Sequence, residues 1–140
     1  MGSGKRSVAG IAVQDRRLFI ARRKPGGDLG GKWEFPGGKV EERESDAEAL
    51  IREYLEELGV IVAVGPCAGT VSFEHQGKHF SLSAYRVFFD SEDFKLPEHS
   101  EWRWAALEEI ETLDFAESDL KLLPFLKEAV PKLQFLEQLP

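Results

Sequence analysis

The amino-acid sequence predicts an α/β sandwich, in which helices lie on both faces of a mixed β-sheet. A helical pattern without Gly or Pro runs over residues 46–58, between segments that alternate or are rich in β-branched residues, as strands are. A second helical pattern, with leucines at three-residue spacing, follows over residues 118–130. The order of strands, helix, strands and helix favours layers of helix on the two faces of a sheet.

Length and charge limit the classes of protein to be considered. The chain has 140 residues, which we expect to form a single domain (residues 1–140) with a disordered start at residues 1–6. The net charge of −7 argues against general nucleic-acid binding. The sequence has no apolar run of about 18 residues for a membrane helix, and no secretory signal at its start. With Cys67 as the single cysteine, we expect a cytoplasmic protein, either a monomer or a homodimer.

Turn-forming residues divide the rest of the chain into shorter elements. We expect a hairpin of residues 7–13 and 17–22, and a flexible Gly/Pro-rich loop over residues 24–31. The helix over residues 118–130 should kink or start late at Pro124 and end at Pro131. The remaining expected elements are strands at residues 61–64, 70–75, 78–89 and 102–105, and a helical turn at residues 107–110.

The first helix carries its own start and stop signals. Ser45 and Glu48 have the spacing of a capping box, and Gly59 supplies the left-handed residue that ends many helices. Its apolar positions share one face and are expected to pack on the core: Ala47, Leu50, Ile51, Tyr54 and Leu58.

Three carboxylates, Glu53, Glu56 and Glu57, lie beside this apolar face at spacing i, i+3 and i+4. Hard oxygen ligands converging from one helix are what Mg²⁺ or Mn²⁺ requires. The alternative is a solvated acidic face in which Arg52 pairs with Glu48 and Glu56.

The segment before the helix, Trp33 to Lys39, favours a ligand site over a plain turn. Pro36 restricts the backbone and two glycines follow it, so the chain can turn sharply or approach a ligand closely. Residues 1–36 hold eight Lys or Arg against three Asp or Glu, whereas residues 41–57 hold eight acidic residues against two arginines. A basic segment beside an acidic one suits a complex of metal and polyphosphate, although alternating surface charge would give the same sums.

The residues from Gly38 to Val60 resemble the signature of the Nudix family. That signature is Gly-x5-Glu-x7-Arg-Glu-U-x-Glu-Glu-x-Gly-U, where U is a bulky aliphatic residue, and Gly38, Glu44 and the segment 52–60 match it. The one departure is Tyr54, whose hydroxyl would need a partner or a route to solvent if it is buried. The segments 19–23 and 32–39 resemble the MutT-type nucleoside triphosphate pyrophosphohydrolases of this family.

The resemblance implies a Nudix-type α/β/α sandwich and hydrolysis of a pyrophosphate link, usually with Mg²⁺ and here with Mn²⁺ as an alternative. By motif position, Glu56 and Glu57 are metal ligands, Glu53 is a third ligand or the general base, and the Gly38 carbonyl completes the site. Arg52 and Glu44 would orient the loop and the ligands. Relatives place one more acidic ligand or base on a distant loop, and here we favour Glu98 over Glu101.

The resemblance also points to residues that bind the nucleotide. Arg23 lies where MutT-type proteins contact it; Phe35 is a candidate for stacking on the base or for the core, and Lys39 for a phosphate contact or plain surface. With these we place Glu34 and Asp119 in the substrate site. Asp119, or Ser118, falls where purine-preferring relatives carry Asn, and this chain contains no Asn, which leaves a pyrimidine or a broader range open.

The expected activity is the conversion of a nucleoside triphosphate, with a normal or oxidised base, to a monophosphate and pyrophosphate. The alternatives are another nucleoside diphosphate derivative, such as a nucleotide sugar, a dinucleoside polyphosphate or an RNA 5′ end, or a module that senses a nucleotide without cleaving it.

Overall fold

The fold was analysed in a computed structural model that describes residues 5–134. The first strand, β1, begins at Lys5, so the expected disorder of residues 1–6 is wrong for Lys5 and Arg6. The rest of that prediction, for residues 1–4, lies outside the described residues, as do residues 135–140.

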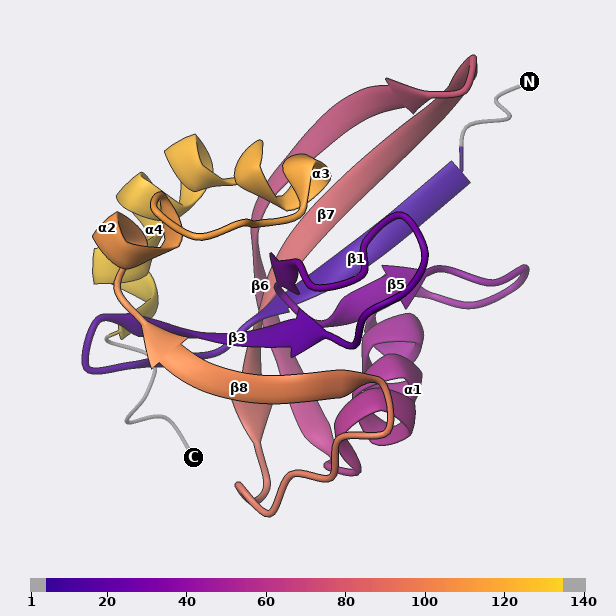
Figure 1. The fold of residues 1–140 in the computed structure, drawn as a ribbon. Helices are drawn as coiled ribbons and strands as arrows, with labels where there is room; N and C mark the ends of the chain where they lie inside the picture. The colour runs from indigo at the N-terminus through magenta and orange to yellow at the C-terminus, as the bar shows by residue number, and fades with distance from the viewer. Residues whose placement is uncertain (1–4, 135–140) are drawn as a thin grey trace.

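The strands form two four-stranded sheets (Figure 1). The first has the order β5-β1-β7-β6 and is mixed, because β1 pairs parallel with β7 whereas its other pairs are antiparallel. The second is antiparallel, with the order β2-β3-β4 and β8 paired to β3. The strand bounds are β1 Lys5–Ile11, β2 Val13–Gln14, β3 Arg17–Arg23, β4 Trp33–Glu34, β5 Gly37–Lys39, β6 Val62–His75, β7 Lys78–Phe89 and β8 His99–Ala105.

The chain passes from one sheet to the other at Ala12. The expected first hairpin is therefore only partly right: Val13 and Gln14 pair with β3, but the residues up to Ile11 belong to the other sheet. Asp15 and Arg16 form the two-residue turn, with φ of 52° and 63°, the left-handed backbone that such tight hairpins need. A continuous apolar run hides this change of sheet from the sequence.

Helices cover the strands on two sides (Figure 1). Helix α1 (Asp46–Leu58) packs through a cluster that includes Val8, Phe19 and Leu50. The helices α2 (Leu107–Ile110), α3 (Glu117–Leu120) and α4 (Leu123–Gln134) lie on the other side, on a cluster that includes Ile20 and Leu126. The predicted α/β/α sandwich with a mixed sheet is confirmed, with the strands divided over two sheets.

Helix α1 has the predicted ends. The Ser45 hydroxyl accepts the Glu48 amide at 3.1 Å, the Glu48 carboxylate accepts the Ser45 amide at 2.8 Å, and Gly59 has φ of 68°. The predicted apolar face is wrong at Ile51, which is 40% exposed. The buried face is turned toward Ala49, Leu50, Tyr54, Glu57 and Leu58. One of the three acidic residues, Glu57, is consequently inside the protein.

The C-terminal helix agrees with its prediction at Pro124 and differs from it at Pro131. Residues 117–134 form two helices, because the Lys121 and Leu122 amides bond in short turns to Ser118 and Asp119. Pro124 lies in the first turn of α4, where a missing N–H is tolerated, so the late start is confirmed. Pro131 does not end the helix but lies within α4.

The hairpin around Gln76 and Gly77 is confirmed, but its first strand is longer than expected. The single strand β6 covers both the segment 61–64, except Ile61, and the segment 70–75, with shifts of register between Val64 and Cys67 and between Cys67 and Gly69. No helix among residues 5–134 is both long and apolar enough to cross a membrane.

Candidate active site

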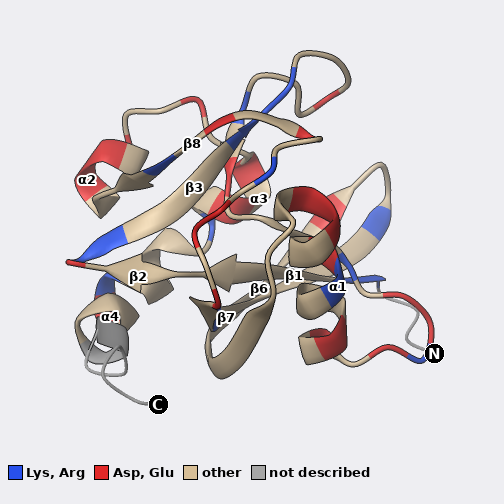
Figure 2. Cartoon of the chain, turned by 90° about the horizontal axis from the view of Figure 1, so that it is seen from below, with Lys and Arg blue, Asp and Glu red and all other residues tan. Residues whose placement is uncertain are grey.

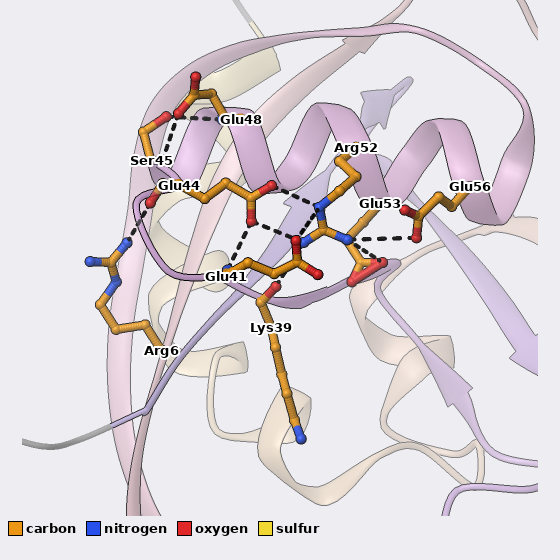
Figure 3. Close-up of polar contacts among 9 residues, drawn as sticks. All are labelled: Arg6, Lys39, Glu41, Glu44, Ser45, Glu48, Arg52, Glu53 and Glu56. Atoms are coloured by element: carbon orange, nitrogen blue, oxygen red, sulfur yellow. Dashed lines mark hydrogen bonds and ion pairs between the residues drawn. The ribbon is translucent and has the colours of Figure 1, made fainter.

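Arg52 ties the loop before α1 to the helix (Figure 3). Its guanidinium donates to both oxygens of Glu44, at 2.7 and 3.0 Å, and to the Lys39 carbonyl at 3.0 Å. Glu44 in turn accepts the backbone N–H of Glu41 at 2.8 Å. These bonds fix the path of the loop relative to the helix. The alternative interpretation of the acidic face paired Arg52 with Glu48 and Glu56. Glu56 does lie 3.6 Å from Arg52, whereas the Glu48 carboxylate accepts the Ser45 amide in the helix cap.

This arrangement predicts the effect of acid on stability. The hydrogen bonds from Arg52 and from the Glu41 amide lower the pKa of Glu44 to about 2, below its ordinary 4.5. A carboxyl whose pKa is depressed by folding stabilises the protein above pH 4.5, and this contribution is lost as the pH falls toward 2. We expect Glu44→Gln to lower the stability at pH 6 and to take up about one proton fewer on acid unfolding. Denaturant titrations from pH 6 to 2, without divalent cation, measure both. The exposed Glu42→Gln is the control, and equal pH profiles for the two variants would contradict the prediction.

The three carboxylates of helix α1 that were predicted to bind metal, Glu53, Glu56 and Glu57, have different surroundings. The side chain of Glu56 is 59% exposed, that of Glu53 is 16% exposed, and that of Glu57 is 8% exposed. Glu53 packs on the backbone of Gly38, where an added Cβ would overlap Glu53 Oε2. Glycine at this position therefore allows the Glu53 carboxylate to contact the backbone of β5. Figure 2 shows the acidic positions as red bands along α1.

Burial changes the protonation of the two inner carboxyls. The pKa of Glu57 is raised to about 9, first by burial and then by the nearby Glu34. Burial also raises the pKa of Glu53, against the opposing charge of Arg52. The Oε1 atom of Glu57 has no hydrogen-bond partner among the described residues. A buried carboxylate without a partner is costly unless a cation or a proton neutralises it. The residues present therefore fit a divalent cation held by oxygen ligands.

Polar side chains of the second sheet also lie near Glu57. His99, at the start of β8, is 1% exposed, and its Nε2 lies 2.8 Å from Glu34 Oε2 and 3.7 Å from Glu57 Oε1. Arg23 donates to the same oxygen of Glu34 at 3.2 Å, and its other terminal nitrogen is 3.8 Å from Glu98. Strands β3, β4 and β8 thus bring Arg23, Glu34 and His99 against the helix.

Asp119, in α3, is buried beside the segment that leads from β4 to β5. One of its oxygens accepts the Phe35 amide at 2.9 Å, which joins α3 to the segment after β4. Burial raises its pKa to about 8, although the bond from Phe35 acts in the opposite direction. The Phe35 ring is 3% exposed and packs edge-on against Phe115, so it belongs to the core. Its backbone, and not its ring, faces the polar group.

The structure brings most of the predicted site residues together. Glu98 lies beside Arg23, whereas Glu101 pairs with Arg22 and Arg103. The choice of Glu98 as the acid of this loop stays a prediction. Lys39 contacts Arg52 through its carbonyl, and its side chain extends away from the cluster (Figure 3). His99 was not among the predicted site residues. Its position depends on the pairing of Arg23 with His99 across β3 and β8, which no local pattern announces.

Comparison with known proteins identifies the family. A family model described as the NUDIX domain matches residues 7–124. The chain belongs to the Nudix family of hydrolases. The CTP pyrophosphohydrolase of Escherichia coli is 36% identical over 116 residues, which cover 83% of this chain and 86% of that protein. The 8-oxo-dGTP diphosphatase of Proteus vulgaris is 37% identical over 89 residues, or 62% of this chain and 80% of that one.

Solved structures of similar proteins have the same fold. The solution structure of the E. coli ORF135 protein superposes with a TM-score of 0.82 at 34% identity, and covers 92% of this chain and 94% of that one. The resemblance to the Nudix family that we drew from residues 38–60 is confirmed, as is the resemblance to its MutT-type enzymes that we drew from residues 19–23 and 32–39. This Nudix hydrolase keeps every polar and glycine position of the Nudix signature, and the one residue that departs from it, Tyr54, lies in the core.

Proposed function

We propose that this Nudix enzyme hydrolyses a nucleoside triphosphate to a monophosphate and pyrophosphate, with Mg²⁺ or Mn²⁺ as cofactor. One observation carries the proposal: Glu53 lies against the Gly38 backbone, while Glu57, on the same helix, offers a buried oxygen that has no hydrogen-bond partner within residues 5–134. Gly38, Glu53, Glu56 and Glu57 would hold the cation, with Glu98 as an additional ligand from the loop before β8. All are oxygen donors, as Mg²⁺ prefers.

The reaction requires a water oxygen to bond to a phosphorus while the anhydride P–O bond breaks and its electron pair leaves with the departing phosphate. A divalent cation supplies activation of the water and neutralises charge on the phosphoryl oxygens. Where Glu53 does not ligate the cation, it would accept the proton of the water, because burial raises its pKa and makes it a stronger base. Glu98, exposed and paired with Arg23, is the alternative base. Arg52 positions the loop and does not touch the substrate.

Residues outside helix α1 would bind the nucleotide. Arg23 and Lys39 would supply positive charge for the phosphates. A cleft for the rest of the nucleotide lies between the loop after β3, the end of the β6–β7 hairpin and α3, and it has a volume of about 420 Å³. Lys32 and Lys121 are among its lining residues, beside the strand that ends at Glu34. Its size suits a nucleoside.

For the base we propose a pyrimidine, with CTP as the first candidate. Asp119 is buried near Glu34 and the backbone of Phe35 and follows Ser118, which lines the cleft. Its carboxyl could accept from the exocyclic amine of cytosine. The name of the E. coli relative, CTP pyrophosphohydrolase, supports this choice. The name of the Proteus relative, 8-oxo-dGTP diphosphatase, makes an oxidised purine the competing outcome.

The test is release of pyrophosphate and of phosphate from normal and oxidised nucleoside triphosphates, nucleotide sugars and dinucleoside polyphosphates, with Mg²⁺ or Mn²⁺. We expect pyrophosphate from CTP with the highest kcat/KM, and no turnover in chelator. Asp119→Asn should lower kcat/KM for CTP about tenfold or more relative to that for 8-oxo-dGTP, because an amide presents a donor as well as an acceptor.

Other outcomes would overturn the proposed substrate or activity. A sugar phosphate as the only product would assign a nucleotide sugar as the substrate. Nucleotide binding without any turnover would assign a sensing module. An unchanged ratio of kcat/KM in Asp119→Asn would remove this residue from base recognition.

A further inference from the structure

The inner polar group of the site has the composition of a transition-metal site. It consists of Glu34 from β4, Glu57 from α1 and His99 from β8, which are 8%, 6% and 1% exposed. One ligand atom from each residue lies within 4.8 Å of the other two. Three strongly polar side chains from three separate elements thus meet in a volume closed to solvent.

The distances suit a bound cation. His99 Nε2 is 2.8 Å from Glu34 Oε2 and 3.7 Å from Glu57 Oε1. An ion with bonds of about 2.0–2.2 Å holds neighbouring ligands at separations of this order, so small shifts of the side chains suffice. Glu57 Oε1, buried and without a hydrogen-bond partner among the described residues, points into the group as an acceptor.

The ligand types select the ion. An imidazole nitrogen with two carboxylates suits borderline ions such as Zn²⁺, whereas Mg²⁺ prefers oxygen ligands and keeps several waters. The charges are balanced at the edge of the group: Arg23 donates to Glu34 Oε2 at 3.2 Å, and Glu98 lies 3.8 Å from the same guanidinium. The two carboxylates of Glu34 and Glu57 therefore face one positive side chain, which is itself paired outward.

We propose that Glu34, Glu57 and His99 form an inner site for a borderline divalent ion such as Zn²⁺, distinct from the Mg²⁺ site on the outer side of α1. Glu57 is common to both sites. An ion in the inner site withdraws this carboxylate from the outer one, so Zn²⁺ opposes Mg²⁺. The opposition to Mg²⁺ rests on the proposed function, whereas the binding of Zn²⁺ does not.

The test is optical titration of the metal-free protein with Co²⁺, which reports its own coordination, followed by displacement with Zn²⁺. All proteins carry Cys67→Ser, since the exposed thiol is another ligand for these ions. We expect one Co²⁺ per chain, and at least tenfold weaker binding in His99→Gln. His79→Gln, at an exposed histidine paired with Glu74, is the matched control and should bind as the parent does. Equal Co²⁺ affinity in His99→Gln and the parent would overturn the proposal.

Two further measurements complete the test. Millimolar Mg²⁺ should weaken Co²⁺ binding in the parent protein, and independent binding of the two ions would overturn the sharing of Glu57. If His99→Gln lacks the parent's far-ultraviolet circular dichroism, Glu34→Gln replaces it, with the same tenfold loss expected. Because no substrate is present, the result stands even if no nucleotide is turned over.

Discussion

Glu57→Gln is expected to lower kcat/KM at least about 100-fold, since loss of an outer contact to a metal ligand alone costs about 10–100-fold. Among the three carboxylates Glu53, Glu56 and Glu57 of helix α1, Glu57 is the most buried. A neutral amide in its place is a poor ligand for Mg²⁺. Steady-state kinetics with saturating Mg²⁺ measure the loss. Glu101→Gln, at an acid paired with Arg22 and Arg103, should stay within a few-fold of the parent.

The same variant should be more stable than the parent when metal is absent. Folding raises the pKa of Glu57 from 4.5 to about 9, so its contribution to stability is fully present below pH 4.5 and is lost as the pH rises toward 9. Without divalent cation at pH 8, we expect Glu57→Gln to increase the free energy of unfolding by at least about 1 kcal/mol. Urea unfolding in chelator at pH 5 and pH 8 measures this. A variant both inactive and destabilised at pH 8 would indicate a structural role.

Gly10→Ala is expected to destabilise the protein by about 1–3 kcal/mol or more, the usual range for overpacking. A Cβ at Gly10 would overlap the Tyr54 hydroxyl and lie 2.6 and 2.7 Å from two ring carbons. Tyr54 is fully buried, and the close packing of protein interiors leaves a buried ring little room to move. Since the backbone of Gly10 does not require glycine, the cost measures the steric contact alone. Thermal and urea unfolding provide the measurement.

Replacement of the aromatic residue should reverse this effect. Tyr54→Leu restores the aliphatic residue of the Nudix signature and removes the ring atoms that meet Gly10, so the double variant should be more stable than the sum of the single effects by about 1–3 kcal/mol. Tyr54→Phe removes only the hydroxyl, leaves the ring carbons in place, and should not rescue Gly10→Ala. Additive effects of Gly10→Ala and Tyr54→Leu would show that the two residues do not constrain each other.

Local signals allowed much of the helix α1 and its loop to be predicted. Ser45, Glu48 and Gly59 act within a few residues of one another, so the ends of the helix could be read without knowledge of the fold. The motif spacing likewise places Glu53 and Glu57 on one side of the helix. Neighbours decide the burial of each. Glu57 is buried beside Glu34 of β4 and His99 of β8, whereas Ile51 is 40% exposed.

Long-range pairing explains what the sequence could not predict. His99 reaches Glu34 only because β8 and β4 both flank β3, and the order of strands in a sheet is not encoded by periodicity. The change of sheet at Ala12 is hidden for a similar reason, since both sheets demand apolar residues there. Pro131 shows a different limit: the packing of α4 on the sheets outweighs the loss of one helical hydrogen bond.

The outer strand β6 has a consequence for the behaviour of the protein in concentrated solution. It forms an edge of the first sheet over 14 residues, long enough to accept a strand from another molecule. Pro66 lacks an amide hydrogen, and the register shifts on either side of Cys67 bend the strand, so a regular row of free backbone groups cannot form across its middle. These irregularities are therefore protective, and straightening them would turn the enzyme's longest edge into a template for aggregation.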